Sequence, residues 1–183
     1  MKYLSLFPVL FLWVSCIPLR VAPTIKTDKI MQAQKFKKNM PNNYVFIVED
    51  PKDADEFYNF INTKFKLNNE SVDMDVPIKI DGKPYYLSFI ETEKTTKTLN
   101  ILPLAVDAAL ESKDNDPVLE DMHVSRNGTW YLMLLVFDDS NNDCLNPKHS
   151  DREKVVNYLR HLHKEYLNTA NYLEAQLKNI SAY

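Results

Sequence analysis

Apolar residues recur along the chain with two spacings, and the shorter spacing predicts strands. Residues 43–49 (N-Y-V-F-I-V-E) place apolar residues on both faces of a strand, which is typical of a strand in the interior of a sheet. Residues 76–93 alternate between apolar and polar on either side of Asp81 and Gly82, a pair that favours a tight turn, so they predict a hairpin. A further strand is predicted over residues 95–101.

A second hairpin is predicted near position 128. Asn127 and Gly128 both tolerate a positive φ, which favours a type I′ turn. Residues 129–137 after it are apolar on both faces, so we expect this strand to run through the middle of a sheet. We expect Trp130 to be among its anchors.

Helical spacing appears in three places. Residues 50–53 (D-P-K-D) have the composition of a helix start, with an aspartate that can cap and a proline at the first helical position. The apolar face that follows consists of Phe57, Phe60, Ile61 and Phe65. A short helix is predicted over residues 103–112. The longest helix is predicted from the capping box at residues 150–153 to about residue 179.

These elements predict one α+β domain over residues 41–183. Its order is β-α-β-β-β-α-β-β-α. We expect a mixed or antiparallel sheet covered by helices, with a long C-terminal helix.

The N-terminus has a different pattern, which is typical of an export signal. Lys2 is followed by a mainly apolar core of eleven residues, 4–14, and Ser15 is a small residue before Cys16. Eleven helical residues rise only about 16 Å, which is too short to span a bilayer. Residues 1–15 are therefore predicted to be a signal peptide.

Residues 13–16 (W-V-S-C) resemble the lipobox of bacterial lipoproteins. The resemblance implies that Cys16 is acylated and becomes the new N-terminus, and two or more acyl chains hold a protein stably on a bilayer. The alternative is an ordinary secreted protein in which Cys16 forms a disulfide with Cys144.

Charge divides the chain after residue 40. Residues 17–40 contain six basic residues and one acidic residue, whereas residues 41–183 contain fifteen basic and twenty-four acidic residues. We expect residues 16–40 to be a flexible basic tether, either solvated or in contact with anionic lipid headgroups. The acidic body argues against nucleic-acid binding, which needs a clustered basic face.

Glycine content excludes several catalytic classes. The chain has two glycines, Gly82 and Gly128, and the predicted turns explain both. A Walker loop, a GxGxxG dinucleotide site and a GxSxG nucleophile elbow all need further glycines. The sequence also contains no HExxH or CxxC motif.

Residues 138–144 contain the only candidate for a metal site. Asp139, Asn141 and Asp143 alternate like the first three ligands of a calcium loop, but Cys144 stands where such a loop needs glycine. A solvated acidic turn is the favoured interpretation, with a weak Ca²⁺ site as the alternative. Nucleophilic catalysis by Cys144 with His149 is disfavoured, because no helix N-terminus follows the cysteine to lower its pKa.

As a whole the chain resembles small uncharacterised lipoproteins of Bacteroidota-type bacteria. The resemblance covers the start, the basic spacer and residues 49–58 and 166–175. It implies an envelope location and no reaction, cofactor or functional residue.

The resulting hypothesis is a non-catalytic lipoprotein that binds a protein or another envelope component. Ile17 after the cysteine favours the periplasmic face of the outer membrane. Two alternatives are open: an envelope enzyme or metal-dependent binder that uses residues 138–144, and a secreted partner-binding protein with a Cys16–Cys144 disulfide.

Overall fold

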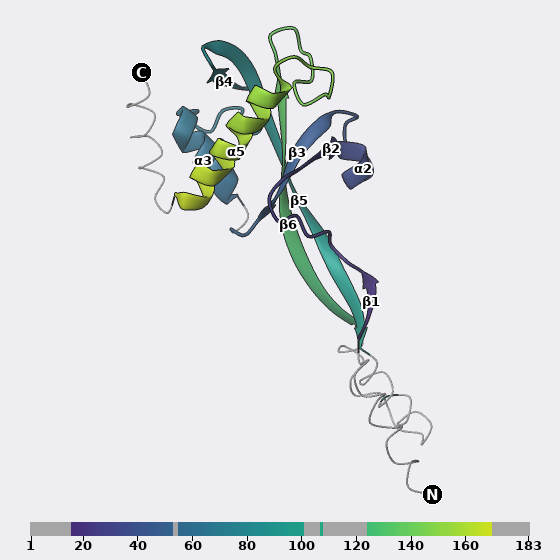
Figure 1. Cartoon of the computed structure of the whole chain (residues 1–183). Helices are drawn as coiled ribbons and strands as arrows, with labels where there is room; N and C mark the ends of the chain where they lie inside the picture. The colour runs from purple at the N-terminus through teal and green to yellow at the C-terminus, as the bar shows by residue number, and fades with distance from the viewer. Residues whose placement is uncertain (1–15, 53–54, 101–106, 108–123, 170–183) are drawn as a thin grey trace, which may run out of the picture. The chain divides into compact units, whose positions relative to one another are not determined.

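The computed structural model describes residues 16–52, 55–100, 107 and 124–169 (Figure 1). The chain divides into two compact units, which we describe separately. The first unit comprises Met1–Pro23 and Glu93–Thr129, and the second unit comprises Thr24–Thr92 and Trp130–Tyr183.

The second unit is built on a sheet in the order β4-β5-β6-β3-β2. Its strands are β2 (Lys29–Gln32), β3 (Tyr44–Asp50), β4 (Val76–Ile80), β5 (Lys83–Asn100) and β6 (Val124–Phe137). The last two continue into the first unit. Strand β3 is antiparallel to both of its neighbours, β2 and β6.

Apolar layers cover both faces of β3 and β6 in the second unit, as the runs at 43–49 and 129–137 predict. Helices α3 (Glu56–Phe65) and α5 (Arg152–Asn168) lie over one face (Figure 1). Helix α2 (Ala33–Phe36) belongs to the smaller layer on the opposite face. Phe46, Val48, Leu132 and Leu134 face the first layer, and Val45, Ile47, Tyr131 and Met133 face the second.

The predicted fold class is wrong, because strand dominates the structure. Strands make up 40% of it and helices 25%, so the architecture is an antiparallel sheet with a few helices packed on it, not a helix-covered α+β domain. Part of the difference arises in residues 16–40, the predicted tether, which contain two strands. Strand β5, for its part, does not end after the first hairpin. It continues through the polar residues 93–100, where no apolar alternation marks a buried face. The strand predicted over 95–101 is part of it.

One predicted hairpin is confirmed and the other is wrong. Asp81 and Gly82 have φ values of 50° and 77° and join β4 to β5, with Ile80 paired to Lys83. Asn127 and Gly128, in contrast, lie inside β6. A Cβ atom at Gly128 would overlap the present position of the Glu93 carboxylate, which is the flexible end of its side chain.

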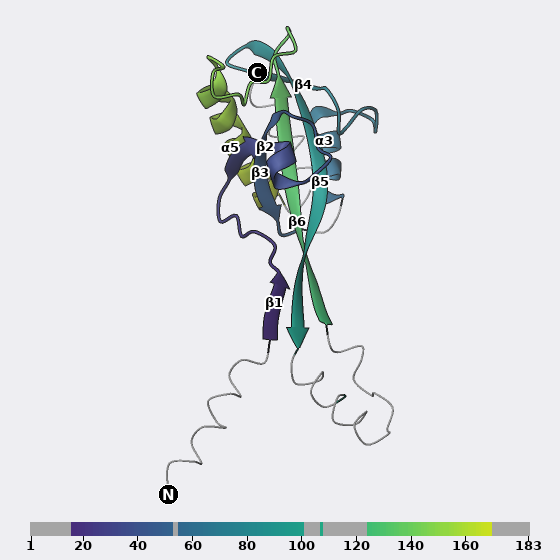
Figure 2. The same cartoon turned by 90° about the vertical axis from the view of Figure 1, so that its right-hand side faces the viewer.

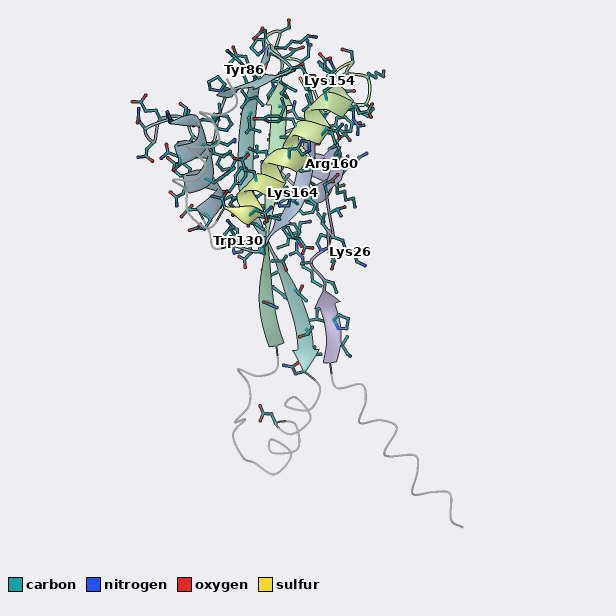
Figure 3. All side chains as sticks on the ribbon, turned by 60° about the vertical axis from the view of Figure 1, so that its left-hand side comes forward. Lys26, Tyr86, Trp130, Lys154, Arg160 and Lys164 are labelled. Carbon is teal, nitrogen blue, oxygen red and sulfur yellow. The ribbon has the colours of Figure 1, made fainter. Side chains whose placement is uncertain are left out.

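Trp130 is not an anchor of the core. It is 38% exposed and pairs with Asp50, the last residue of β3 (Figure 3). The side chains that anchor β6 follow it, from Tyr131 to Val136, and all of them are buried.

The two main helices differ from the prediction at their ends. Helix α3 begins at Glu56, and its N-cap Asp55 has a left-handed backbone with φ 69°. Helix α5 begins at Arg152 and ends at Asn168, since Thr169 is extended. The uninterrupted helix expected to residue 179 is therefore wrong, although residues 170–183 themselves lie outside the described residues. The helix predicted over 103–112 also lies outside them, apart from Asp107.

Residues 16–40 are not a structureless tether. They contain β1 (Cys16–Arg20), β2 and α2. Ala33 is fully buried, and its N–H donates to the carbonyl of Asn43 at 2.9 Å. The apolar residues in this stretch show no period, and those that are buried, Ile25, Ala33 and Phe36, pack with residues of β3 and β6.

In the first unit β1 pairs with β5 in an antiparallel register (Figure 2). Ile17 lies opposite Leu99 and Arg20 lies opposite Lys97, with a register shift between Pro18 and Arg20. The N–H of Ala22 donates to Thr96 Oγ1 at 3.0 Å, which continues the contact beyond the strand.

Candidate functional site

The loop that follows β6 is organised around one carboxylate. Asp138 Oδ1 accepts the backbone N–H groups of Ser140 and Asn142, each at 2.9 Å. The amide of Asn142 donates to both carboxylate oxygens, at 3.1 and 2.9 Å. These hydrogen bonds, led by the side chain of Asn142, lower the pKa of Asp138 to about 2. Asp138 therefore stays charged and holds the turn closed.

Asp143, one of the predicted metal ligands, is used to attach this loop to the sheet. Its Oδ2 accepts the N–H of Tyr44 at 2.7 Å and its Oδ1 accepts the N–H of Leu145 at 3.0 Å. Both oxygens are therefore engaged by the protein backbone. Residue 143 also forms a bridge to Phe137 across the loop.

The other two predicted ligands are exposed residues of the same loop. Asn141 is exposed and has a left-handed backbone with φ 59°, and Asp139 is exposed beside it. Within the described part of the chain, no group of three or more histidine, cysteine, aspartate and glutamate side chains is arranged to hold a metal ion. A weak Ca²⁺ site at Asp139, Asn141 and Asp143 stays a prediction, and its geometry would require Asp143 to release backbone N–H groups.

Cys144 and His149 lie together, but their hydrogen bonds are wrong for a nucleophile and its base. The Sγ of Cys144 is 3.7 Å from His149 Nε2, which is also 3.3 Å from Asp138 Oδ2. The Nδ1 atom of His149 accepts the backbone N–H of Asp151 at 3.2 Å. In the neutral ring the proton therefore belongs on Nε2, where it is donated to Asp138. That nitrogen cannot then take the proton of the thiol.

Burial makes the thiol less reactive still. Cys144 is free and fully buried. Desolvation, together with the carboxylates of Asp138, Asp143 and Asp151, raises its pKa to about 12. Since the thiolate is the reactive form, Cys144 is a buried apolar side chain at neutral pH. The pair of helical histidines offers no alternative: His161 is exposed, and His163 is half-buried with a pKa lowered by burial.

A second polar cluster, which the sequence pattern does not reveal, joins the end of α5 to the end of β3. The hydroxyl of Tyr166 donates to the two oxygens of Asp50, at 3.0 Å each. Lys52 Nζ donates to the backbone carbonyls of Tyr166 and Thr169 at 2.8 and 2.9 Å and lies 4.3 Å from the centre of the Tyr166 ring. We call Asp50, Lys52, Glu91 and Tyr166 the α5 latch.

Glu91 is the member of the latch with an unusual environment. Its Oε2 accepts the N–H of Asp55 at 3.2 Å, and its Oε1 is buried without a hydrogen-bond partner among the described residues. Burial raises the pKa of Glu91, and nearby Asp50 and Asp55 raise it further. Burial also raises the pKa of Asp50, against the hydrogen bonds from Lys52 and Tyr166.

The hydrogen bonds of the latch attach the end of α5 to the end of β3. Burial raises the pKa of Tyr166, so its hydroxyl remains a donor, and Lys52 satisfies two carbonyls at the C-terminus of α5. Sequence reasoning assigned Asp50 as a helix cap and Lys52 to the first helical turn. Their partners lie more than 100 residues away in the chain, so no local pattern could have shown the cluster.

None of the helices in the described residues combines the length and the apolar character that a membrane crossing requires. Comparison of the chain with known protein families, with curated proteins and with solved structures finds no match.

Proposed function

We propose that the chain is a lipoprotein of the bacterial cell envelope, fastened to a membrane by acyl groups on Cys16, whose folded part is a non-catalytic binding or structural module. The observation that carries the proposal is the apolar run of residues 4–14, which is preceded by Lys2 and ends at Ser15 and Cys16. A lipid transferase needs a cysteine at this position, because sulfur is the nucleophile that accepts the lipid.

The place of Cys16 in the fold is compatible with this location. Cys16 lies in strand β1, so an acyl group there would be attached to a folded strand. The first unit would then lie at the bilayer surface, with no long linker between lipid and strand. We propose the periplasmic face of the outer membrane, because Ile17 stands where an aspartate would favour retention at the inner membrane.

The arrangement of Cys144 and His149 favours a non-catalytic module. The only buried thiol in the described residues has a raised pKa, and the neighbouring imidazole donates its proton to Asp138. The ligand would be a protein or another envelope component.

The test is the intact mass of the protein extracted from the membranes of a bacterial host. The proposal predicts a chain that begins at Cys16 and carries an added mass of acyl size. The variant Cys16→Ser should move from the detergent phase to the aqueous phase on detergent partitioning. A soluble chain lighter by two hydrogens would instead identify the secreted form with a Cys16–Cys144 disulfide and would overturn the proposal.

A further inference from the structure

One face of the β1–β5 pair in the first unit carries two unlike cross-strand pairs. Ile17 lies opposite Leu99, and Arg20 lies opposite Lys97. Residues directly opposite in an antiparallel pair share a face, and Leu99 and Lys97 are two positions apart on β5. The two pairs therefore lie on the same face, which we call the β1–β5 face.

The basic pair is unfavourable in isolation. Two positive side chains directly opposite each other destabilise a strand pair. Arg20 is exposed and Lys97 is half-buried, and no acidic partner of either is found among the described residues. An anion bound between the two side chains would replace this repulsion with charge-assisted hydrogen bonds, and phosphate is a favourable acceptor for both arginine and lysine.

The apolar pair lies on the side of Cys16. Ile17 follows Cys16 directly and is 44% exposed, and Leu19 and Val21 are 58% and 66% exposed. The register shift between Pro18 and Arg20 puts Ile17 on the same face as Arg20, so Ile17 is the exposed apolar residue of β1 beside the basic pair, where contact with water is unfavourable.

The order of these groups matches the order of layers in a bilayer. A strand rises about 3.3 Å per residue, and Leu99 and Lys97 are two positions apart on β5, so the basic pair lies about 7 Å from the apolar pair along the strands. Apolar Ile17 and Leu99 come first, and the basic pair follows. The headgroup region adds about 5–8 Å to each side of the hydrocarbon core. In this order the acyl chain on Cys16 would lie in the hydrocarbon core. The aliphatic side chains would lie at its boundary, and the two cations would lie among the phosphates.

We propose that the β1–β5 face docks on an anionic lipid bilayer with its strands directed along the bilayer normal, so that Ile17 and Leu99 lie at the acyl boundary and Arg20 and Lys97 on lipid phosphates. This inference rests on the proposed function, since it takes Cys16 as the attachment point. A second copy of the chain fits this face less well, because a two-fold contact would bring two basic pairs together.

The experiment uses the chain from residue 16 onward with Cys16→Ser, which is the mature protein under the proposal without its acyl group. Its binding to vesicles of phosphatidylcholine is compared with binding to vesicles that also contain phosphatidylglycerol. We expect binding to the anionic vesicles only. The double variant Arg20→Gln, Lys97→Gln should bind them about 30-fold more weakly, since each basic residue near the surface contributes about fivefold.

The matched control removes two exposed lysines of the second unit, Lys79→Gln and Lys148→Gln. It has the same net charge as the double variant, and it should keep binding within about twofold. In high salt the charge contribution is screened. Ile17→Ser should weaken the binding that remains under that condition. Circular dichroism checks that all three variants are folded.

Three outcomes would overturn the inference: no binding to anionic vesicles, equal losses in the double variant and its control, or a dimer that Arg20→Gln, Lys97→Gln strengthens. The acyl mass of the membrane-extracted protein is measured separately. An acylated protein whose β1–β5 face does not bind lipid would refute this inference alone. If the β1–β5 face binds lipid but the protein is never acylated, the proposed function is refuted and the inference about lipid binding is retained.

Discussion

The hydroxyl of Tyr166 is 3.0 Å from each carboxylate oxygen of Asp50. This contact joins the last turn of α5 to the last residue of β3, 116 positions earlier in the chain. The ring of Tyr166 also packs against Phe57 and Phe60 of α3, with centroids 5.0 and 5.4 Å apart. One side chain therefore fastens two helices and the sheet of the second unit.

Removal of that hydroxyl should destabilise the protein. Tyr166→Phe keeps the ring in place but leaves the half-buried carboxylate of Asp50 with only the backbone N–H of Lys52 as a donor, so we expect a loss of about 1–3 kcal/mol in the free energy of unfolding. Urea unfolding followed by circular dichroism measures it. Tyr86→Phe is the matched control, because Tyr86 is 37% exposed, and it should change stability by less than about 0.5 kcal/mol. Equal effects of the two substitutions would show that the bond to Asp50 contributes nothing.

Loss of the Lys52 ammonium should weaken the end of α5. Lys52→Met keeps most of the aliphatic chain but removes the ammonium donor from the carbonyls of Tyr166 and Thr169, so that Tyr166 keeps only the N–H of Thr169 at 3.2 Å. We expect a loss of about 1–3 kcal/mol and faster amide hydrogen exchange in the last turn of α5. Lys79→Met, at an exposed position of β4, is the control. Unchanged exchange in α5 would contradict the role given to Lys52.

Glu91→Gln should stabilise the protein at neutral pH. Burial raises the pKa of Glu91, so the folded state binds its proton more tightly than the unfolded state does. Stability from this group is present at acidic pH and is lost as the pH rises through the raised pKa. The variant removes the buried charge, so its advantage over the natural protein should be larger at pH 7 than at pH 4. Asp50, whose pKa burial also raises, acts in the same direction in both proteins.

Chemical unfolding of both proteins across this pH range measures the difference. Glu70→Gln, at an exposed position, should leave the pH profile unchanged. A variant that is less stable than the natural protein at pH 7 would show that the charge of Glu91 is compensated.

Cys144 should be unreactive in the folded protein. Its thiol is fully buried and its pKa is raised to about 12, so very little thiolate is present at pH 7. In a Cys16→Ser background, an aromatic disulfide reagent should modify Cys144 much faster in denaturing urea than in buffer. The reaction is followed by absorbance. Rapid stoichiometric modification of the folded protein would revive the cysteine–histidine alternative.

Local patterns identified the elements whose residues are buried by their immediate neighbours. The consecutive apolar residues 45–48 and 131–136 became strands with both faces covered, because such runs leave no face suited to water. Asp81 and Gly82 became a tight turn, since both adopt the positive φ that a two-residue loop requires. Phe57, Phe60 and Ile61 shared one helical face as their spacing indicates.

Tertiary structure decided the features whose partners are distant in the chain. Asn127 and Gly128 have the residue types of a turn, but they lie within β6, and Gly128 leaves space for Glu93. Ala33 is buried only because it packs against the β3–β6 face, and Asp50 binds Tyr166 instead of starting a helix. In each case the deciding energy comes from burial or a hydrogen bond between residues far apart in sequence. A local pattern of hydrophobicity contains no record of such a contact.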